Sequence, residues 1–126
     1  MPFIHVKSLP FDGEFQAAEV VAGITSDFAA STGVGVEHVT GTWQFILPMH
    51  YAVAGQVAEH QPQNSHPVLV DLLSPDFNDM ETVAKMLKSV AESIAKRTGV
   101  PLQNIFINHR HAHSGMVFDA GEVVRW

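Results

Sequence analysis

Pro2 is the residue whose type and position point most directly to chemistry. If the initiator Met1 is removed, the ring nitrogen of Pro2 becomes an N-terminal secondary amine at the start of an expected strand over residues 2–8. A free α-amino group titrates near ~7.7 to 8.0, and burial or a nearby cation would lower that pKa towards neutral pH, where a general base works best. The other interpretation is that a proline at position 2 only permits N-terminal processing.

A second group of polar side chains lies on the expected strand over residues 104–111. Alternation along the strand puts Phe106, Asn108 and Arg110 on one face, and the isoleucines between them on the other. The isoleucines are expected to pack under helices, which leaves the other three side chains free to face a cleft. The alternative for Arg110 is an ion pair at the surface.

Three histidines also alternate, at His109, His111 and His113. A strand would align them on one face as three potential metal ligands, which gives a rival hypothesis of a metal site. No carboxylate lies among them. The interpretation adopted is therefore an exposed histidine stretch that binds no metal.

The composition describes one ordinary domain. The 126 residues carry 13 acidic and 7 basic side chains, a net charge of -6 without a basic stripe, so nucleic acid and anionic membranes are not expected partners. The absence of cysteine excludes disulfides and thiolate chemistry and is compatible with the cytoplasm, which is the expected location. We expect neither a signal peptide nor a membrane span, which needs ~18 apolar residues.

The pattern of apolar residues predicts alternating strands and helices. Strands are expected over residues 2–8, 38–47, 67–73 and 104–111, and helices over 13–32 and 78–98. The expected buried stripes are Phe15, Ala18, Val21, Ile24 and Phe28 in the first helix, and Met80, Val83, Ala84, Leu87, Val90 and Ile94 in the second. Residues 48–66 are interpreted as a loop with a short extended piece near 51–53, and residues 114–126 as a hairpin.

The two halves of the chain repeat. Thr32-Gly33-Val34 recurs as Thr98-Gly99-Val100, and apolar positions match at the same offset of 66 residues. We therefore predict an α/β (α+β) single domain of two βαβ repeats, over about 2–47 and 67–111, forming a four-stranded mixed sheet with both helices on one face. One sheet face then stays bare, so a homo-oligomer is expected. Pro2 aligns with Val68, so only the first repeat could offer an amine.

A twice-occurring βαβ unit with proline after the initiator methionine resembles the tautomerase superfamily, which includes macrophage migration inhibitory factor, oxalocrotonate tautomerase and the chloroacrylic acid dehalogenases. The resemblance extends over nearly the whole chain in element order. The residues that carry it are Pro2-Phe3-Ile4, the helix end Ala30–Gly33, the strand Val100–Asn108, and the turn Phe118–Gly121, which is similar to an uncharacterised tautomerase-like group. The resemblance implies a homotrimer with sites between subunits, Pro2 as the base, and no cofactor.

Two site residues follow from the same resemblance. Asn108 stands where the inhibitory factor has a site asparagine, and Phe106 where it has a site tyrosine. The family lysine after Thr-Gly is Val34 here, and the arginine pair of the dehalogenases is missing from Leu72–Pro75. The resemblance therefore does not transfer phenylpyruvate-type binding or dehalogenation to this chain.

Keto-enol tautomerisation of a small 2-oxo acid needs a base at the α-carbon, a cation for the carboxylate and a donor for the enolate oxygen. Pro2, Arg110 and Asn108 are assigned to these three roles, since a guanidinium can bind both oxygens of a carboxylate. His50 and Tyr51, in the long loop, are expected to close over the ligand.

Two other functions stay open. Asp119 could activate water and turn the chemistry towards hydration, although an aspartate before Ala-Gly is also an ordinary turn residue. A non-enzymatic trimeric scaffold that binds a partner is the second alternative, and Val34 in place of the lysine favours it.

Overall fold

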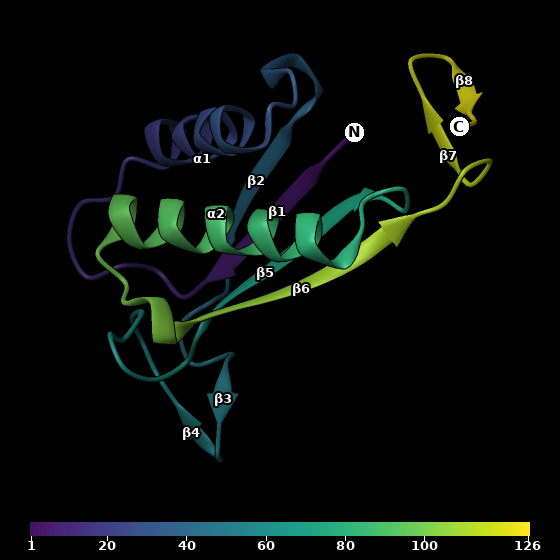
Figure 1. Ribbon diagram of the computed structural model, residues 1–126. Helices are drawn as coiled ribbons and strands as arrows, with labels where there is room; N and C mark the ends of the chain where they lie inside the picture. Colours follow the sequence, from purple (N-terminus) through teal and green to yellow (C-terminus); the bar gives the residue numbers. More distant parts are fainter.

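The computed structural model describes residues 1–126, and a four-stranded mixed sheet forms its centre (Figure 1). The strand order is β2-β1-β5-β6, with β1 antiparallel to β5 and each outer strand parallel to its inner neighbour. The strands are β1 (Phe3–Ser8), β2 (Thr40–Phe45), β5 (Val68–Pro75) and β6 (Ile105–Ala112). The central β5 buries alternate residues, since helices cover one of its faces.

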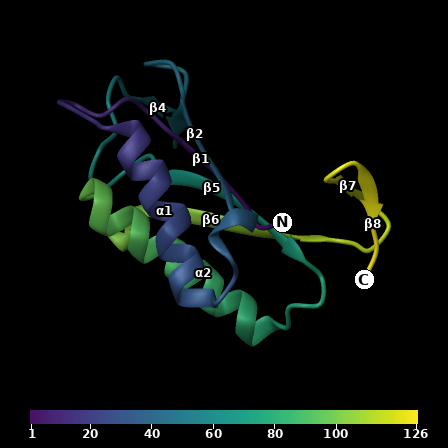
Figure 2. The same ribbon diagram turned by 90° about the horizontal axis from the view of Figure 1, so that it is seen from above.

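Two antiparallel helices, α1 (Ala17–Thr32) and α2 (Met80–Thr98), cover one face of this sheet, as both views show (Figures 1 and 2). Apolar side chains from both helices and from β1 and β5 form one core between the two layers. This arrangement confirms the predicted fold of two βαβ units, a mixed sheet and helices on a single face. Neither helix combines the length and apolar character that a membrane span requires.

The buried stripes of the helices differ in part from the prediction. Ile24 of α1 is buried as expected, but Ala18 is exposed and Val20 is buried instead. In α2, Met80 is 89% exposed and Met86 takes a place in the core. The prediction was wrong here because the start of α1 is apolar on most sides, and because Met80 belongs to the first turn, beyond the core.

The sequence repeat is visible at the ends of both helices. Gly33 and Gly99 both adopt φ +78°, and each donates its N–H to the carbonyl four residues earlier. Such a left-handed residue is the usual helix terminator, and glycine adopts it without steric cost. Short 3₁₀ turns, η1 (Val36–His38) and η2 (Leu102–Asn104), then lead into β2 and β6. The two units thus follow the same path from helix to strand.

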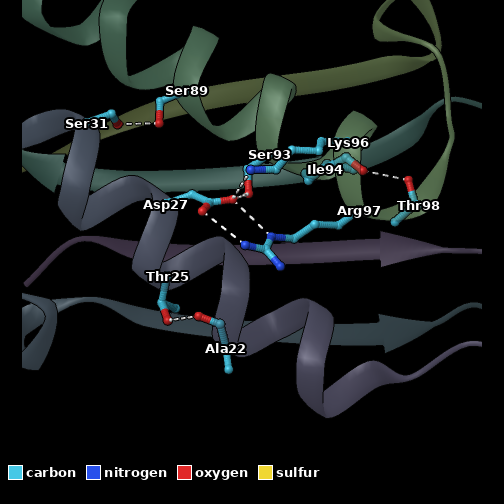
Figure 3. A network of polar contacts seen from close by, with 10 residues as sticks. All are labelled: Ala22, Thr25, Asp27, Ser31, Ser89, Ser93, Ile94, Lys96, Arg97 and Thr98. Atoms are coloured by element: carbon cyan, nitrogen blue, oxygen red, sulfur yellow. Dashed lines mark hydrogen bonds and ion pairs between the residues drawn. The ribbon is translucent and has the colours of Figure 1, made fainter.

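A polar cluster joins the two helices where they cross (Figure 3). The Asp27 carboxylate of α1 accepts hydrogen bonds from Arg97 Nε at 2.9 Å, Arg97 Nη2 at 3.0 Å and Ser93 Oγ at 2.6 Å. Lys96 Nζ lies 3.6 Å from the same carboxylate. The guanidinium of Arg97 lies across Gly23, where a Cβ atom would approach its Cζ to 2.1 Å. Gly23 therefore allows this arginine to reach Asp27.

Two small hairpins complete the chain. The first, β3 (Ala52–Val53) and β4 (Gln56–Val57), lies within residues 48–66, which the sequence pattern predicts to be a long loop. The second, β7 (Val117–Asp119) and β8 (Glu122–Val124), follows β6 and stands at the end of the molecule near the N-terminus (Figures 1 and 2). The two hairpins lie at opposite ends of the sheet.

Candidate active site

The N-terminal amine, that of Met1, borders a cavity of about 290 Å³ at the start of β1. Pro2 is buried, and its carbonyl accepts a hydrogen bond from the Thr40 N–H at 2.9 Å, which fixes it beside the start of β2. The Met1 amine donates to the carbonyl of His38. The cavity is lined by Met1, Phe3, Glu37, His38, Thr40, Leu73, Val117, Phe118 and Asp119.

Burial and charge act in opposite directions on this amine. Burial, which disfavours the ammonium form, lowers the pKa of the Met1 amine below its usual value, and the negative charge of Asp119 partly opposes that effect. Because β7 carries Asp119 to this cavity, the carboxylate and the amine face the same space. A partly desolvated amine beside a carboxylate is suited to transfer protons near neutral pH.

A second cavity, of about 430 Å³, opens on the uncovered face of the sheet. Phe3 and Leu73 line both cavities, so the two adjoin. The other side chains that line it are His5, Thr42, Asp71 and Arg110. Arg110 forms no ion pair within the subunit, so its charge is available to an anion or to a neighbouring subunit.

Strand register fixes how far the predicted site residues lie from Pro2. Phe3 pairs with Leu73, and Leu73 pairs with Arg110, which puts Arg110 two strands away from Phe3, about 10 Å. Asn108 lies about 7 Å further along β6 and Phe106 about 7 Å beyond that, near the opposite end of the sheet. Of the three, only Arg110 borders a cavity that adjoins the amine of the same subunit.

Tyr51 and His50 lie at the end of the molecule opposite to Pro2. The Tyr51 hydroxyl donates to the Pro67 carbonyl at 2.7 Å, and Pro67 precedes the end of β5 that is distant from Leu73. Burial raises the pKa of this phenol. His50 is exposed, with its Nδ1 2.9 Å from the Pro48 carbonyl oxygen. Within one subunit, neither side chain can reach a ligand at Pro2.

No family model and no curated protein sequence matches this chain. Solved structures do match it along almost its whole length. A wild-type fused 4-OT, a symmetric trimer, shares 15% of residues over 97% of this chain and 94% of its own, with a TM-score of 0.80. The chain has the tautomerase fold. Two further structures extend this likeness to other members of the fold.

The first is Pt0534, a protein inactivated by 2-oxo-3-pentynoate, which is 12% identical over 97% of this chain and 94% of its own, with a TM-score of 0.82. The second is N1, a member of the cis-3-chloroacrylic acid dehalogenase family, which is 14% identical over 97% of this chain and 82% of its own, with a TM-score of 0.78. Identities this low establish the fold alone.

The histidines of this tautomerase-fold protein do not converge on a common point. His109 Nε2 is hydrogen-bonded to Ser74 Oγ at 2.7 Å, and its ring meets the His111 ring edge-on at a centroid distance of 4.7 Å. His113 instead donates from Nδ1 to Asp76 at 3.0 Å. The structure contains no group of three or more histidine, aspartate or glutamate side chains that could hold a metal ion.

Sequence reasoning missed several side chains around the amine, notably Glu37, His38 and Phe118. A signal for the first two existed, since a strand parallel to β1 must begin beside the N-terminus, and the residues before it must therefore border Pro2. Phe118 carried no such signal, because nothing in the sequence fixes where the terminal hairpin points. In this tautomerase-fold chain, the hairpin lies over the start of β1.

Proposed function

We propose that this protein is a cofactor-independent tautomerase that interconverts the keto and enol forms of a small 2-oxo acid, with the N-terminal amine of Pro2 as general base. The observation that carries the proposal is the cavity at the start of β1, which is shared by the partly buried N-terminal amine and Asp119. This cavity adjoins the one that Arg110 lines. The likeness to Pt0534, which 2-oxo-3-pentynoate inactivates, supports a 2-oxo acid as the substrate class.

The mechanism requires removal of Met1. While Met1 is present, the Pro2 nitrogen belongs to a tertiary amide and cannot act as a base. Once it is free, the secondary amine takes a proton from C3 of the 2-oxo acid, the carbon next to the keto group, and the electron pair of that C–H bond moves to the carbonyl oxygen to form an enolate. Burial lowers the pKa of the amine at position 1, and it would act in the same direction on the amine of Pro2, which is more deeply buried.

The remaining roles fall to Arg110 and Asn108. Arg110 binds the substrate carboxylate, and the amide N–H of Asn108 donates to the enolate oxygen. The proton on Pro2 then passes to the enolate oxygen, which gives the enol; in the ketonisation direction the enol loses its O–H proton and Pro2 delivers a proton to C3. Neither direction needs a cofactor. Because Asn108 and Phe106 lie far from Pro2 along β6, we assign them to the Pro2 site of a neighbouring subunit.

The protein therefore functions as a homotrimer in this proposal. The uncovered sheet face, which carries Phe3, Phe106 and Leu73 beside charged residues, supports burial against other copies of the chain. The fused 4-OT with the same fold is a symmetric trimer. Tyr51 and His50 are assigned to ligand closure only across such an interface, because they lie distant from Pro2 in their own subunit.

The test begins with intact mass, which reports whether Met1 is removed. Ketonisation of a small panel of enols is then compared between wild type, Pro2→Ala and the control Pro48→Ala, which changes an exposed proline outside the site. General-base catalysis contributes about 10²–10⁴-fold, and Pro2→Ala keeps a primary amine, so we expect kcat/KM to fall about 10²-fold. Equal rates for Pro2→Ala and wild type would remove Pro2 from the mechanism.

The carboxylate contact is tested separately by Arg110→Gln, with Arg125→Gln as a matched change at an exposed arginine. Loss of a bidentate contact to a carboxylate should raise KM at least tenfold for 2-oxo acids, and much less for neutral enols. An unchanged preference for acids over neutral enols would contradict the role of Arg110.

A second candidate function is hydration, and the placement of Asp119 in the cavity of the amine favours it. In this reaction Asp119 takes a proton from water, the hydroxide oxygen adds to an activated double bond of the substrate, and the Pro2 ammonium protonates the adjacent carbon. Asp119→Asn should abolish the hydrated product and retain ketonisation. Hydration at the wild-type rate in this variant would exclude Asp119 as the water-activating group.

A further inference from the structure

The hairpin β7–β8 follows the C-terminal end of β6 and reaches the amine cavity. Contacts at the base of the hairpin hold it in place. Val117, Phe118 and Asp119 line the cavity, but all three belong to a two-stranded hairpin that projects beyond the main sheet (Figures 1 and 2). A two-stranded hairpin alone is marginally stable in water. Whatever fixes its base therefore determines whether these residues stay at the amine.

Asp76, directly after β5, contacts both chain segments at the base of that hairpin. Its Oδ1 accepts a hydrogen bond from the indole Nε1–H of Trp126 at 2.7 Å, and its Oδ2 accepts one from His113 Nδ1–H at 3.0 Å. His113 precedes β7 and Trp126 follows β8. One carboxylate thus links the entry and the exit of the hairpin to the end of β5.

Neighbouring contacts strengthen this connection. The Trp126 ring packs edge-on against Phe77 at a centroid distance of 6.0 Å, and the backbone N–H of Trp126 donates to Ser114 Oγ at 2.8 Å. The backbone N–H of Asp76 also donates to the Ala112 carbonyl at 2.9 Å. Hydrogen bonds from Trp126 and then His113 lower the pKa of the Asp76 carboxyl, so it is ionised and accepts both bonds at neutral pH.

We propose that Asp76 is a positioning residue for the amine site: by binding His113 and Trp126 together, it holds the hairpin so that Phe118 and Asp119 stay over the N-terminal nitrogen. Asp76 itself does not line the cavity and touches no reacting atom. The proposal extends the proposed tautomerase function, since it concerns the same site, but its first test does not depend on activity.

Three variants separate this role from a general effect on folding. Asp76→Asn keeps the size of the side chain and removes the charge. Trp126→Phe removes the indole N–H donor and keeps a smaller aromatic ring against Phe77. Asp79→Asn is the control, because it makes the same chemical change three residues later, at the N-cap of α2, where asparagine also caps well.

The first measurement is hydrogen exchange of the hairpin amides, with the Gly115 N–H, which donates to the Val124 carbonyl, as the reporter. Asp76→Asn and Trp126→Phe should each speed exchange in residues 115–126 at least tenfold, while amides of β1 and β5 keep wild-type rates. Asp79→Asn should leave the hairpin unchanged. Exchange at the wild-type rate in both Asp76→Asn and Trp126→Phe would overturn the proposal, and Trp126→Phe decides alone if Asp76→Asn does not fold.

The second measurement is the titration of the N-terminal amine, which is obtained from its rate of acylation as a function of pH. Burial lowers the pKa of this amine and Asp119 raises it. The hairpin supplies both Asp119 and the covering Phe118, so its release should move the titration away from its wild-type position in Asp76→Asn and Trp126→Phe, but not in Asp79→Asn. An unmoved titration in a protein with a freed hairpin would refute the link to the site. If the wild type has no tautomerase activity, the proposed function is refuted, but both measurements remain valid.

Discussion

Replacing Asp27 by asparagine tests the ion pair at the helix crossing. The contacts of Arg97 and Ser93 lower the pKa of the Asp27 carboxyl from 3.8 to about 2, a change of about 1.8 units, which corresponds to about 2.4 kcal/mol. The side chain remains 26% exposed, and solvent screening reduces this figure to about 1 kcal/mol. For a chain of 126 residues, that loss lowers Tm by about 4 °C.

The sign of the pH dependence follows from the direction of the shift. The folded-state pKa of Asp27 is depressed, so the stabilisation is fully present above about pH 3.8, is lost as pH falls, and is absent below about pH 2. The stability difference between wild type and Asp27→Asn should therefore be constant from pH 5 to 8 and shrink below pH 4. In the Asp27→Asn variant, position 27 has no carboxyl to protonate, so this position does not contribute to unfolding at acid pH.

Urea unfolding at a series of pH values, at one fixed protein concentration, measures this difference. Lys85→Ala is the control, because Lys85 pairs with Glu81 at 4.0 Å on a largely exposed surface and should contribute less than about 0.5 kcal/mol. If Asp27→Asn matched wild type at pH 7, or if the difference persisted undiminished at pH 3, the ion pair would not stabilise the helix crossing as argued.

Three further substitutions probe the same framework. Gly23→Ala should fail to give the gain of about 1 kcal/mol expected from helix propensity, because its Cβ displaces the Arg97 guanidinium; urea unfolding measures this. Gly99→Ala should cost about 1 kcal/mol, seen as a lower Tm, since its φ of +78° disfavours a side chain. Trp43→Phe removes the indole donor to Ser8 Oγ at 3.1 Å and should cost about 1 kcal/mol in urea unfolding.

The sequence predicted the fold because its repeat has a physical origin in each unit. The Thr-Gly-Val sequences at 32–34 and 98–100 end both helices with the same hydrogen bonds: Thr32 Oγ1 donates to the Phe28 carbonyl, and Thr98 Oγ1 donates to the Ile94 carbonyl. Local signals of this kind reveal element order. They do not distinguish which face of an evenly apolar helix is buried, which is why Ala18 was misplaced.

The site was less predictable, because its residues come from segments that are distant in sequence. How such segments lie relative to one another depends on the tertiary structure and not on local sequence patterns. Alternation placed Arg110 and Asn108 on the uncovered face, but only the register of β6 against β5 shows that they differ in distance from Pro2. Tyr51 illustrates the same limit: its loop hairpin lies at the end of the sheet opposite to the amine. A prediction from one chain also lacks the neighbouring subunits that the proposed site requires.

Differences between the two repeats show where the scaffold has become specialised. Trp43 and His109 occupy equivalent positions, and each ring is hydrogen-bonded to the equivalent serine, Ser8 or Ser74. The hydrogen bond is thus kept, while a ring that serves packing in the first repeat is replaced by a titratable one in the second. That replacement lies near the end of β6 that leads into the hairpin, two strands from the start of β1. Packing alone gives no reason to exchange the two rings, so this end of the sheet, with Pro2, is where function should be sought.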